Sequence, residues 1–64
     1  MIYTNSQVSK LIDEYIHSER DRSIMKDRLI NGMRFEPLAE KYDLSVAQVK
    51  RITYKYSDYI FNLR

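Results

Sequence analysis

Residues 35–55 read FEPLAEKYDLSVAQVKRITYK, and this stretch predicts two short helices joined by a tight turn. Ser45 and Gln48 have the spacing of a capping box, in which each residue bonds the backbone N–H of the other. This pattern marks the start of a second helix at Val46. Two short helices that meet across Asp43-Leu44-Ser45 are typical of a helix-turn-helix.

The apolar residues of this stretch have the roles that a helix-turn-helix requires. Ala39 is small at the position where the two helices would cross most closely, and Leu44 would fill the turn. Val49 and Ile52 would turn the inner face of the second helix onto the first. The apolar positions of the motif are Leu38, Ala39, Tyr42, Leu44, Val49 and Ile52.

Two further helices are predicted upstream of the motif. Thr4 and Gln7 form another capping box, and an apolar stripe with helical spacing follows it, which predicts an N-terminal helix over 4–17. A second helix covers about 19–31. Gly32 lies just past its end, where a left-handed residue is favoured and glycine has no Cβ clash.

We therefore expect an all-α single domain over 1–64, with no strand. Its three-helix core with the helix-turn-helix spans 19–56, and the N-terminal helix packs beside it. The sequence leaves open whether the first two helices are separate or joined through Ser18.

A family resemblance covers residues 18–56. The stretch extends from Arg20-Asp21-Arg22 to Lys55, and its motif carries Leu-Ala-Glu-Lys-Tyr-Asp-Leu-Ser, followed by Val49 and Ile52. It resembles the C-terminal promoter-binding domain of bacterial sigma factors. It looks even more like the small sigma-like helix-turn-helix proteins of prophages and mobile elements. The resemblance implies a transcriptional regulator that binds double-stranded DNA, with RNA polymerase as a further partner.

Two positions depart from the family pattern. Asp43 stands in the turn where the family usually has glycine, and aspartate tolerates the left-handed conformation better than most residues. Arg34 stands where the family usually has a serine or threonine cap, which weakens the start of the first motif helix. Nothing in the chain resembles the sigma domain that melts promoter DNA, so we do not expect a complete sigma factor.

The charge distribution favours the second motif helix as the DNA-binding element. The formal net charge of the chain is only +2. Residues 1–45 carry seven basic and eight acidic side chains, a net charge of −1. Residues 46–64 carry four basic side chains and one acidic, a net charge of +3. Positive charge is thus concentrated where binding to a polyanion would require it.

Helical geometry divides the second motif helix into two faces, because successive residues are about 100° apart. The residues expected to face the core are Val49, Ile52, Tyr56, Tyr59, Ile60 and Leu63. The residues expected to bind DNA in the major groove are Ala47, Gln48, Lys50, Arg51, Tyr54 and Lys55. Arginine holds guanine and glutamine holds adenine through paired hydrogen bonds, and lysines at the edges of the face reach phosphates.

No pattern in the chain predicts catalysis, a cofactor or a metal site. The chain has no cysteine, and His17 is its only histidine, so thiolate zinc sites and histidine clusters are not expected. No apolar run approaches the roughly 20 residues that span a bilayer. We expect a cytoplasmic protein that is not an enzyme and does not bind membranes.

Other functions remain open at this point. A protein-interaction module would dock on RNA polymerase or another partner without reading DNA. An accessory protein of DNA packaging or recombination could use the same motif. Gln48, Arg51 and the neighbouring basic residues favour DNA, because a docking face would carry more exposed apolar surface.

A homodimer is a separate prediction, which rests on the end of the chain. If the last helix continues past Ser57, Phe61 lies on the same side as Tyr54 and would be exposed in a monomer. Two copies would then pair through their C-terminal helices. In the alternative, the helix breaks near Ser57 and Phe61 folds back onto Val8 and Leu11.

Overall fold

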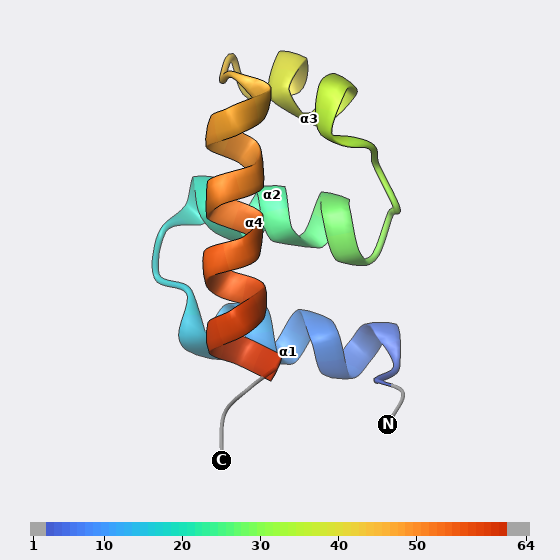
Figure 1. Ribbon diagram of the computed structural model, residues 1–64. Coiled ribbons are helices and arrows are strands. Elements are labelled where there is room, and N and C mark those ends of the chain that lie inside the picture. The colour runs from blue at the N-terminus through green and yellow to red at the C-terminus, as the bar shows by residue number, and fades with distance from the viewer. Residues whose placement is uncertain (1–2, 62–64) are drawn as a thin grey trace.

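Four helices and the short turns between them form the fold, and the computed structural model describes residues 3–61 (Figure 1). The helices are α1 (Asn5–Tyr15), α2 (Glu19–Leu29), α3 (Phe35–Lys41) and α4 (Val46–Phe61). The part of the chain that the structure describes contains no strand, so the predicted all-α class is confirmed. Within the same residues, no helix has the length and apolar content that crossing a bilayer would need.

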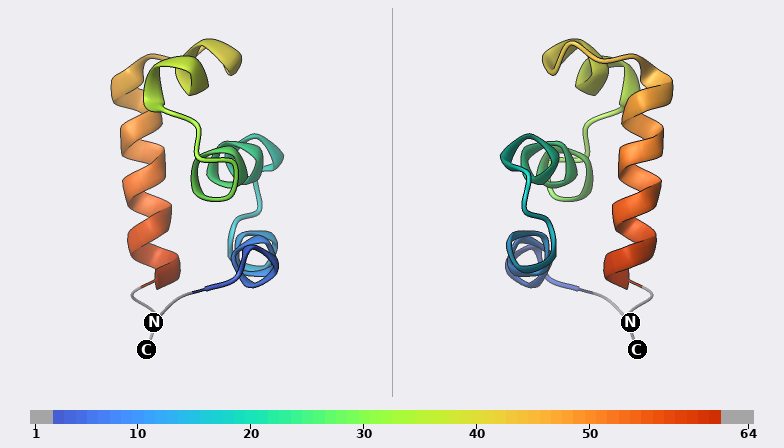
Figure 2. Two further views of the ribbon diagram at one scale, coloured as in Figure 1. Left: turned by 90° about the vertical axis from the view of Figure 1, so that its right-hand side faces the viewer. Right: turned by 90° about the vertical axis from the view of Figure 1, so that its left-hand side faces the viewer.

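The long helix α4 organises the arrangement. Figure 2 shows α4 along one side of the molecule, with α2 and α1 beside it at successive levels along its length. Both helices are seen nearly end-on in this view, so they cross α4 at a steep angle. α3 covers the end of α4 at which that helix begins. The N-terminal half of α4 therefore packs with α2 and α3, and its C-terminal half reaches α1.

The apolar interior consists of two clusters that meet at α2. The first cluster joins α2, α3 and the start of α4 through buried Ile24, Leu38, Ala39 and Val49. The second cluster joins α1, α2 and the end of α4 through buried Val8, Ile12, Ile16, Met25 and Ile60. Ile24 and Met25 are adjacent in α2 and serve different clusters, because neighbouring helix positions point about 100° apart.

The capping box of α1 is confirmed, but the predicted end of this helix is wrong. The Thr4 hydroxyl accepts the Gln7 N–H at 3.2 Å, and the Gln7 side chain accepts the Thr4 N–H at 2.9 Å. The helix ends at Tyr15 instead of residue 17, because Ile16 is extended (φ −116°, ψ 118°). Ser18 then caps α2, so the first two helices are separate.

A side chain of α2 satisfies the end of α1. The guanidinium of Arg22 donates hydrogen bonds to the carbonyl oxygens of Ile16 and Asp13, the latter at 2.8 Å. Carbonyls in the last turn of a helix have no partner within the helix, so such bonds stabilise the break. An ion pair of 2.9 Å between Lys26 and Asp13 adds a second link between α1 and α2.

Two left-handed residues confirm the predicted turns. Gly32 has φ of +69° just past α2, which ends at Leu29 rather than at residue 31. Asp43 has φ of +55° between α3 and α4, so aspartate does adopt the left-handed conformation expected in this turn. Arg34 precedes α3 without any side-chain capping bond, as its residue type predicts.

The end of α4 differs from both alternatives considered above. The helix runs through Ser57 to Phe61 without a break. Phe61 is nonetheless half-buried against the second cluster, and its ring lies 5.2 Å from that of Tyr3. The argument for a homodimer from an exposed Phe61 is therefore wrong, because α1 passes close to the end of α4. The dimer itself stays a prediction.

The predicted inner face of α4 also needs a correction at Tyr59. This side chain is 51% exposed, and its ring packs edge-on against Tyr15 at the rim of the α1–α4 contact, 5.8 Å between centroids. Thr53, which the predicted inner face does not include, is instead buried. Leu63, the last residue expected in the core, lies outside the described residues.

Thr53 provides a test of this packing. Its side chain is 4% exposed, and its hydroxyl oxygen has no hydrogen-bond partner within residues 3–61. Thr53→Val keeps the shape and removes the unpaired hydroxyl, so it should raise the free energy of unfolding by about 1 kcal/mol. Urea denaturation would measure this change.

The matched control is Thr53→Ser, which keeps the hydroxyl and removes the buried methyl group. It should lower the free energy of unfolding by about 1 kcal/mol. A Thr53→Val protein that is less stable than wild type would contradict the assignment of an unpaired hydroxyl.

Candidate nucleic-acid interface

The turn between α3 and α4 is held by short-range hydrogen bonds. The Leu44 N–H bonds to the Ala39 carbonyl at 2.9 Å, which closes the end of α3, and the Leu44 side chain packs on the first cluster. The Ser45 N–H donates to the Gln48 side chain at 2.9 Å, and the Gln48 N–H donates to the Ser45 hydroxyl at 3.1 Å. The second predicted capping box is therefore present, and α4 begins at Val46 as expected.

The side of α4 that faces away from the core carries every residue predicted to bind DNA. The exposed residues of this face are Ala47, Gln48, Lys50, Arg51, Tyr54 and Lys55. Val49 and Thr53 point the other way and are buried. The division into faces that the sequence predicts for this part of α4 is thus the one that the helix adopts.

Gln48 has a structural role that limits its use in base recognition. Its side-chain oxygen accepts the Ser45 N–H, which fixes the direction of the amide group. The second lone pair of this oxygen and the NH₂ group remain for a ligand. A paired contact with adenine uses both the oxygen and the NH₂ group, so Gln48 can make this contact only in the orientation that the cap allows.

A cluster of basic and aromatic side chains lies beside the outer face of α4. The Phe35 ring, at the start of α3, packs edge-on against Tyr54 with 6.1 Å between centroids. The Arg28 guanidinium carbon lies 4.4 Å from the centre of the Phe35 ring, and the Lys50 ammonium lies 5.6 Å from it. We call Arg28, Phe35, Lys50 and Tyr54 the cation–aromatic cluster.

The sequence pattern assigns no site role to two members of this cluster, Arg28 and Phe35. In the sequence, Arg28 is one of the seven basic side chains of residues 1–45, and Phe35 is the first residue of the motif. Neither has a local signal, because a turn containing Gly32 brings the end of α2 against the start of α3. The spacing of aromatic residues along α4 could identify Tyr54 but not its partners.

Lys55 belongs to a different part of the surface. Its ammonium lies 5.3 Å from the Tyr56 ring, and it borders a shallow depression toward the C-terminal half of α4. Tyr15 and Tyr59 form the far side of this depression. The predicted site residues therefore extend along α4 from the turn to the contact with α1.

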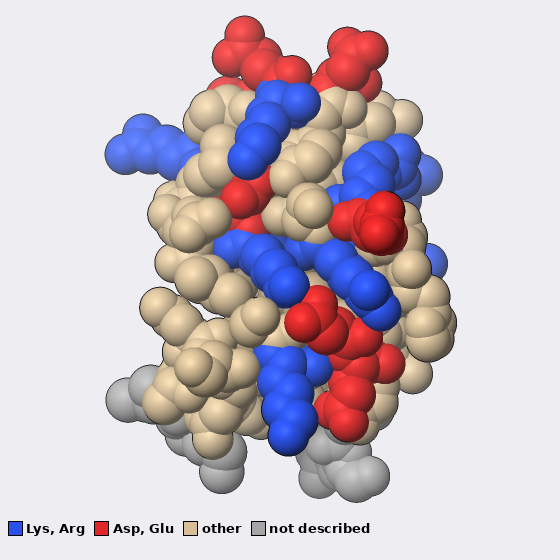
Figure 3. All heavy atoms as spheres, turned by 180° about the vertical axis from the view of Figure 1, so that it is seen from behind, with Lys and Arg blue, Asp and Glu red and all other residues tan. Residues whose placement is uncertain are grey.

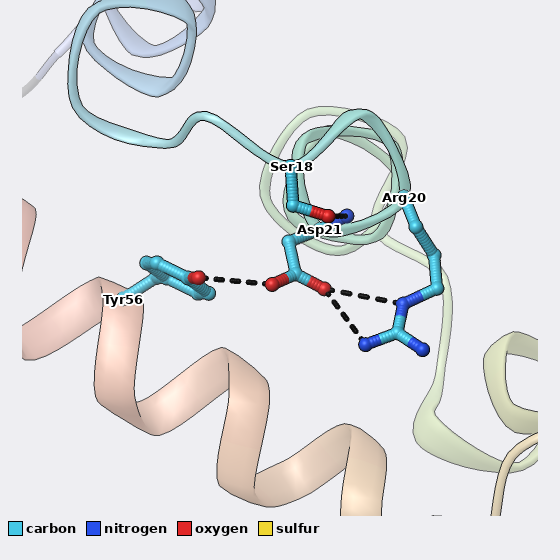
Figure 4. A network of polar contacts seen from close by, with 4 residues as sticks. All are labelled: Ser18, Arg20, Asp21 and Tyr56. Carbon is cyan, nitrogen blue, oxygen red and sulfur yellow. Dashed lines mark hydrogen bonds and ion pairs between the residues drawn. The ribbon is translucent and has the colours of Figure 1, made fainter.

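A buried carboxylate on α2 holds the middle of α4. Figure 4 shows Asp21 between Tyr56 and Arg20. The Tyr56 hydroxyl donates a hydrogen bond to one carboxylate oxygen at 2.9 Å, and Nε and Nη2 of Arg20 each donate to the other oxygen at 3.3 Å. The Asp21 N–H is bonded to the Ser18 hydroxyl, which fixes the start of α2. The hydrogen bond to Asp21 raises the pKa of the Tyr56 phenol, and burial raises it further.

A second buried carboxylate on α2 holds the end of α3. Asp27 accepts hydrogen bonds from the Tyr42 hydroxyl at 2.6 Å, the Lys41 ammonium at 2.8 Å and the Asn31 side chain at 2.9 Å. Burial by itself would raise the pKa of Asp27, but these three donors lower it below its ordinary value. Burial raises the pKa of the Tyr42 hydroxyl, and its bond to the carboxylate adds to this effect.

Charged side chains on the face of the molecule opposite α4 are arranged differently from the charged side chains of α4. Figure 3 shows basic and acidic side chains interspersed on the face opposite α4. Asp13, Asp21 and Asp27 of α1 and α2 form ion pairs. By contrast, the chain has no acidic residue between Asp43 and Asp58, a segment that includes most of α4.

No protein-family model, curated protein or solved structure matches this chain.

The Asp27 contacts predict how stability depends on pH. Because the pKa of Asp27 is lowered in the folded state, its contribution is present above about pH 4 and is lost as the pH falls through the folded pKa. Asp27→Asn should lower the free energy of unfolding at pH 7 by about 1.5–3 kcal/mol, the range for hydrogen bonds to charged groups. In this variant the free energy of unfolding should also fall less steeply as the pH drops below 4.

Asp43→Asn is the matched control, since Asp43 is exposed and asparagine also tolerates the left-handed turn. Urea denaturation across the acidic range would compare the two variants. If Asp27→Asn and wild type lose stability in parallel below pH 4, the carboxylate does not anchor α3.

Proposed function

We propose that this protein binds double-stranded DNA in a sequence-dependent manner and regulates transcription, with α4 in the major groove. The observation that carries the proposal is the outward face of α4. It presents Lys50 and Arg51 to solvent, and neither side chain forms an ion pair within residues 3–61. Arginine on a helix that fits the major groove is the commonest partner of guanine.

The arrangement of the neighbouring helices supports the same proposal. In a helix-turn-helix, the second helix enters the groove and the first crosses the DNA backbone. α4 begins directly after a turn fixed by the Ser45–Gln48 cap, and α3 packs across its N-terminal end. On the side of α4 that faces away from α3, Ala47, Gln48 and Arg51 are exposed and can approach base edges.

A resemblance of residues 18–56 to the promoter-binding domain of sigma factors points in the same direction. It extends the proposal to transcription from phage or mobile-element promoters, with RNA polymerase as a further partner. Asp43 departs from that pattern in residue type, and its φ of +55° keeps the turn that the pattern needs.

Docking on a protein partner is the second candidate function. Tyr15 and Tyr59 are both exposed, and their rings contact each other at the C-terminal half of α4. Tyrosine is enriched at protein interfaces because one side chain offers both apolar area and a hydroxyl. Lys55 borders this surface, so a protein partner bound here would lie next to the proposed DNA-binding face.

Binding to a pool of random duplexes, followed by fluorescence anisotropy on the selected sequence, tests the proposal. We expect affinity to fall steeply as salt rises from about 50 to 200 mM, because bound phosphates release counterions. Equal affinity for selected and scrambled duplexes would contradict sequence recognition. Absence of duplex binding at the lower salt concentration would leave the protein-docking function.

Substitutions on α4 separate base contacts from phosphate contacts. Arg51→Ala should reduce discrimination between the selected and mismatched duplexes by about 1–3 kcal/mol. Lys50→Ala and Lys55→Ala should weaken binding to all duplexes and lower the salt slope by about one unit each. Lys10→Ala, an exposed lysine on α1, is the matched control and should change neither quantity.

Gln48 requires a variant that spares the cap. Gln48→Glu keeps an oxygen for the Ser45 N–H, since glutamate also serves in capping boxes, but removes the NH₂ donor. The added negative charge should weaken binding to all duplexes alike, so the readout is discrimination between the selected and mismatched duplexes. If Gln48 contacts a base, this variant should lose discrimination while its melting temperature stays near that of wild type. Wild-type discrimination would restrict Gln48 to its capping role.

A further inference from the structure

We propose that Arg28 and Lys50, held on the ring of Phe35, form a binding site for a backbone phosphate of the DNA strand beside α4. This inference rests on the proposed DNA-binding function and adds a contact from α2 that the sequence pattern does not predict. The site joins three helices, because Arg28 belongs to α2, Phe35 to α3 and Lys50 to α4.

Arg28 is held in place by two contacts. Its guanidinium lies over the Phe35 ring at 4.4 Å and donates one hydrogen bond to the Met33 carbonyl at 2.9 Å. A guanidinium carries five N–H donors in a rigid plane, so this bond leaves most of them available for a ligand. The side chain is half-buried, which reduces the conformational entropy that binding would cost.

Lys50 places a second positive charge at the same ring. Its ammonium lies 5.6 Å from the Phe35 centroid, so the two cationic groups are no more than 10 Å apart. Within residues 3–61, the ion pairs of the structure engage neither of them.

A DNA phosphate fits this site better than an isolated anion would. The cluster lies next to the outer face of α4 through Tyr54, whose exposed ring contacts Phe35. A helix in the major groove has a phosphate backbone along each of its sides, and phosphate contacts fix the orientation of the helix. A contact from α2 would thus set the angle at which α4 meets the bases.

The first test measures the salt dependence of duplex binding by the full 64-residue chain. The probe is a fluorescein-labelled mixed-sequence duplex about two helical turns long. Arg28→Gln should lower the salt slope by about 0.9, so affinity should fall about 3.5-fold less between 50 and 200 mM salt than in wild type. Arg28→Lys should restore the slope, since it restores the charge. Lys10→Gln is the control and should leave the slope unchanged.

Three outcomes separate the two proposals. If wild type does not bind the duplex at 50 mM salt, both the DNA-binding function and this phosphate site fall. If wild type binds and Arg28→Gln keeps the full slope, only the phosphate site falls. A slope that Arg28→Gln lowers and Arg28→Lys fails to restore assigns Arg28 a purely structural role and also overturns the site.

The second test uses wild-type protein, so it does not depend on how a variant folds. The Arg28 Nε–Hε signal in ¹H–¹⁵N spectra should shift when the duplex is added. An unshifted signal at saturating duplex overturns the site. An equal shift with inorganic phosphate alone overturns its assignment to the DNA strand.

Discussion

The buried carboxylate of Asp27 is the contact on which the arrangement of α3 and α4 depends. It is nearly inaccessible to solvent, and hydrogen bonds from Asn31, Lys41 and Tyr42 compensate for its charge. Lys41 ends α3 and Tyr42 follows it, so fixing both also fixes the turn that leads into α4. A carboxylate buried without these donors would cost several kcal/mol, which makes the position of α3 relative to α2 highly specific.

A second buried carboxylate of α2, that of Asp21, holds α4 further along its length. Asp21 lies about two helical turns from Asp27 on α2 and accepts the Tyr56 hydroxyl. The long helix is thus tied to α2 near its middle, and through α3 at its beginning. These contacts use acidic side chains of α2 inside the fold, while Lys50 and Arg51 of α4 remain on the outside. The outer face of α4 is basic because residues 44–57 include Lys50, Arg51 and Lys55 and no acidic residue, although the net charge of the whole chain is small.

The sequence by itself determined the features that depend on neighbouring residues. Capping boxes at Thr4 and Ser45 and the left-handed residues Gly32 and Asp43 were all predictable. Each involves groups within about four positions of one another, so the local sequence contains the whole interaction. The outward direction of Arg51 was predictable for a similar reason, because helical periodicity fixes which residues oppose a buried Val49.

Only the tertiary structure decided the contacts between side chains of different helices. Arg22 donates a hydrogen bond to a carbonyl at the end of α1, and the Arg28 guanidinium lies over the Phe35 ring. The ring of Phe61 packs against that of Tyr3. A projection of α4 alone leaves Phe61 exposed, because the projection does not include the helix that passes beside it. The pattern along one helix gives the direction of each side chain, but the path of the other helices determines what that side chain meets.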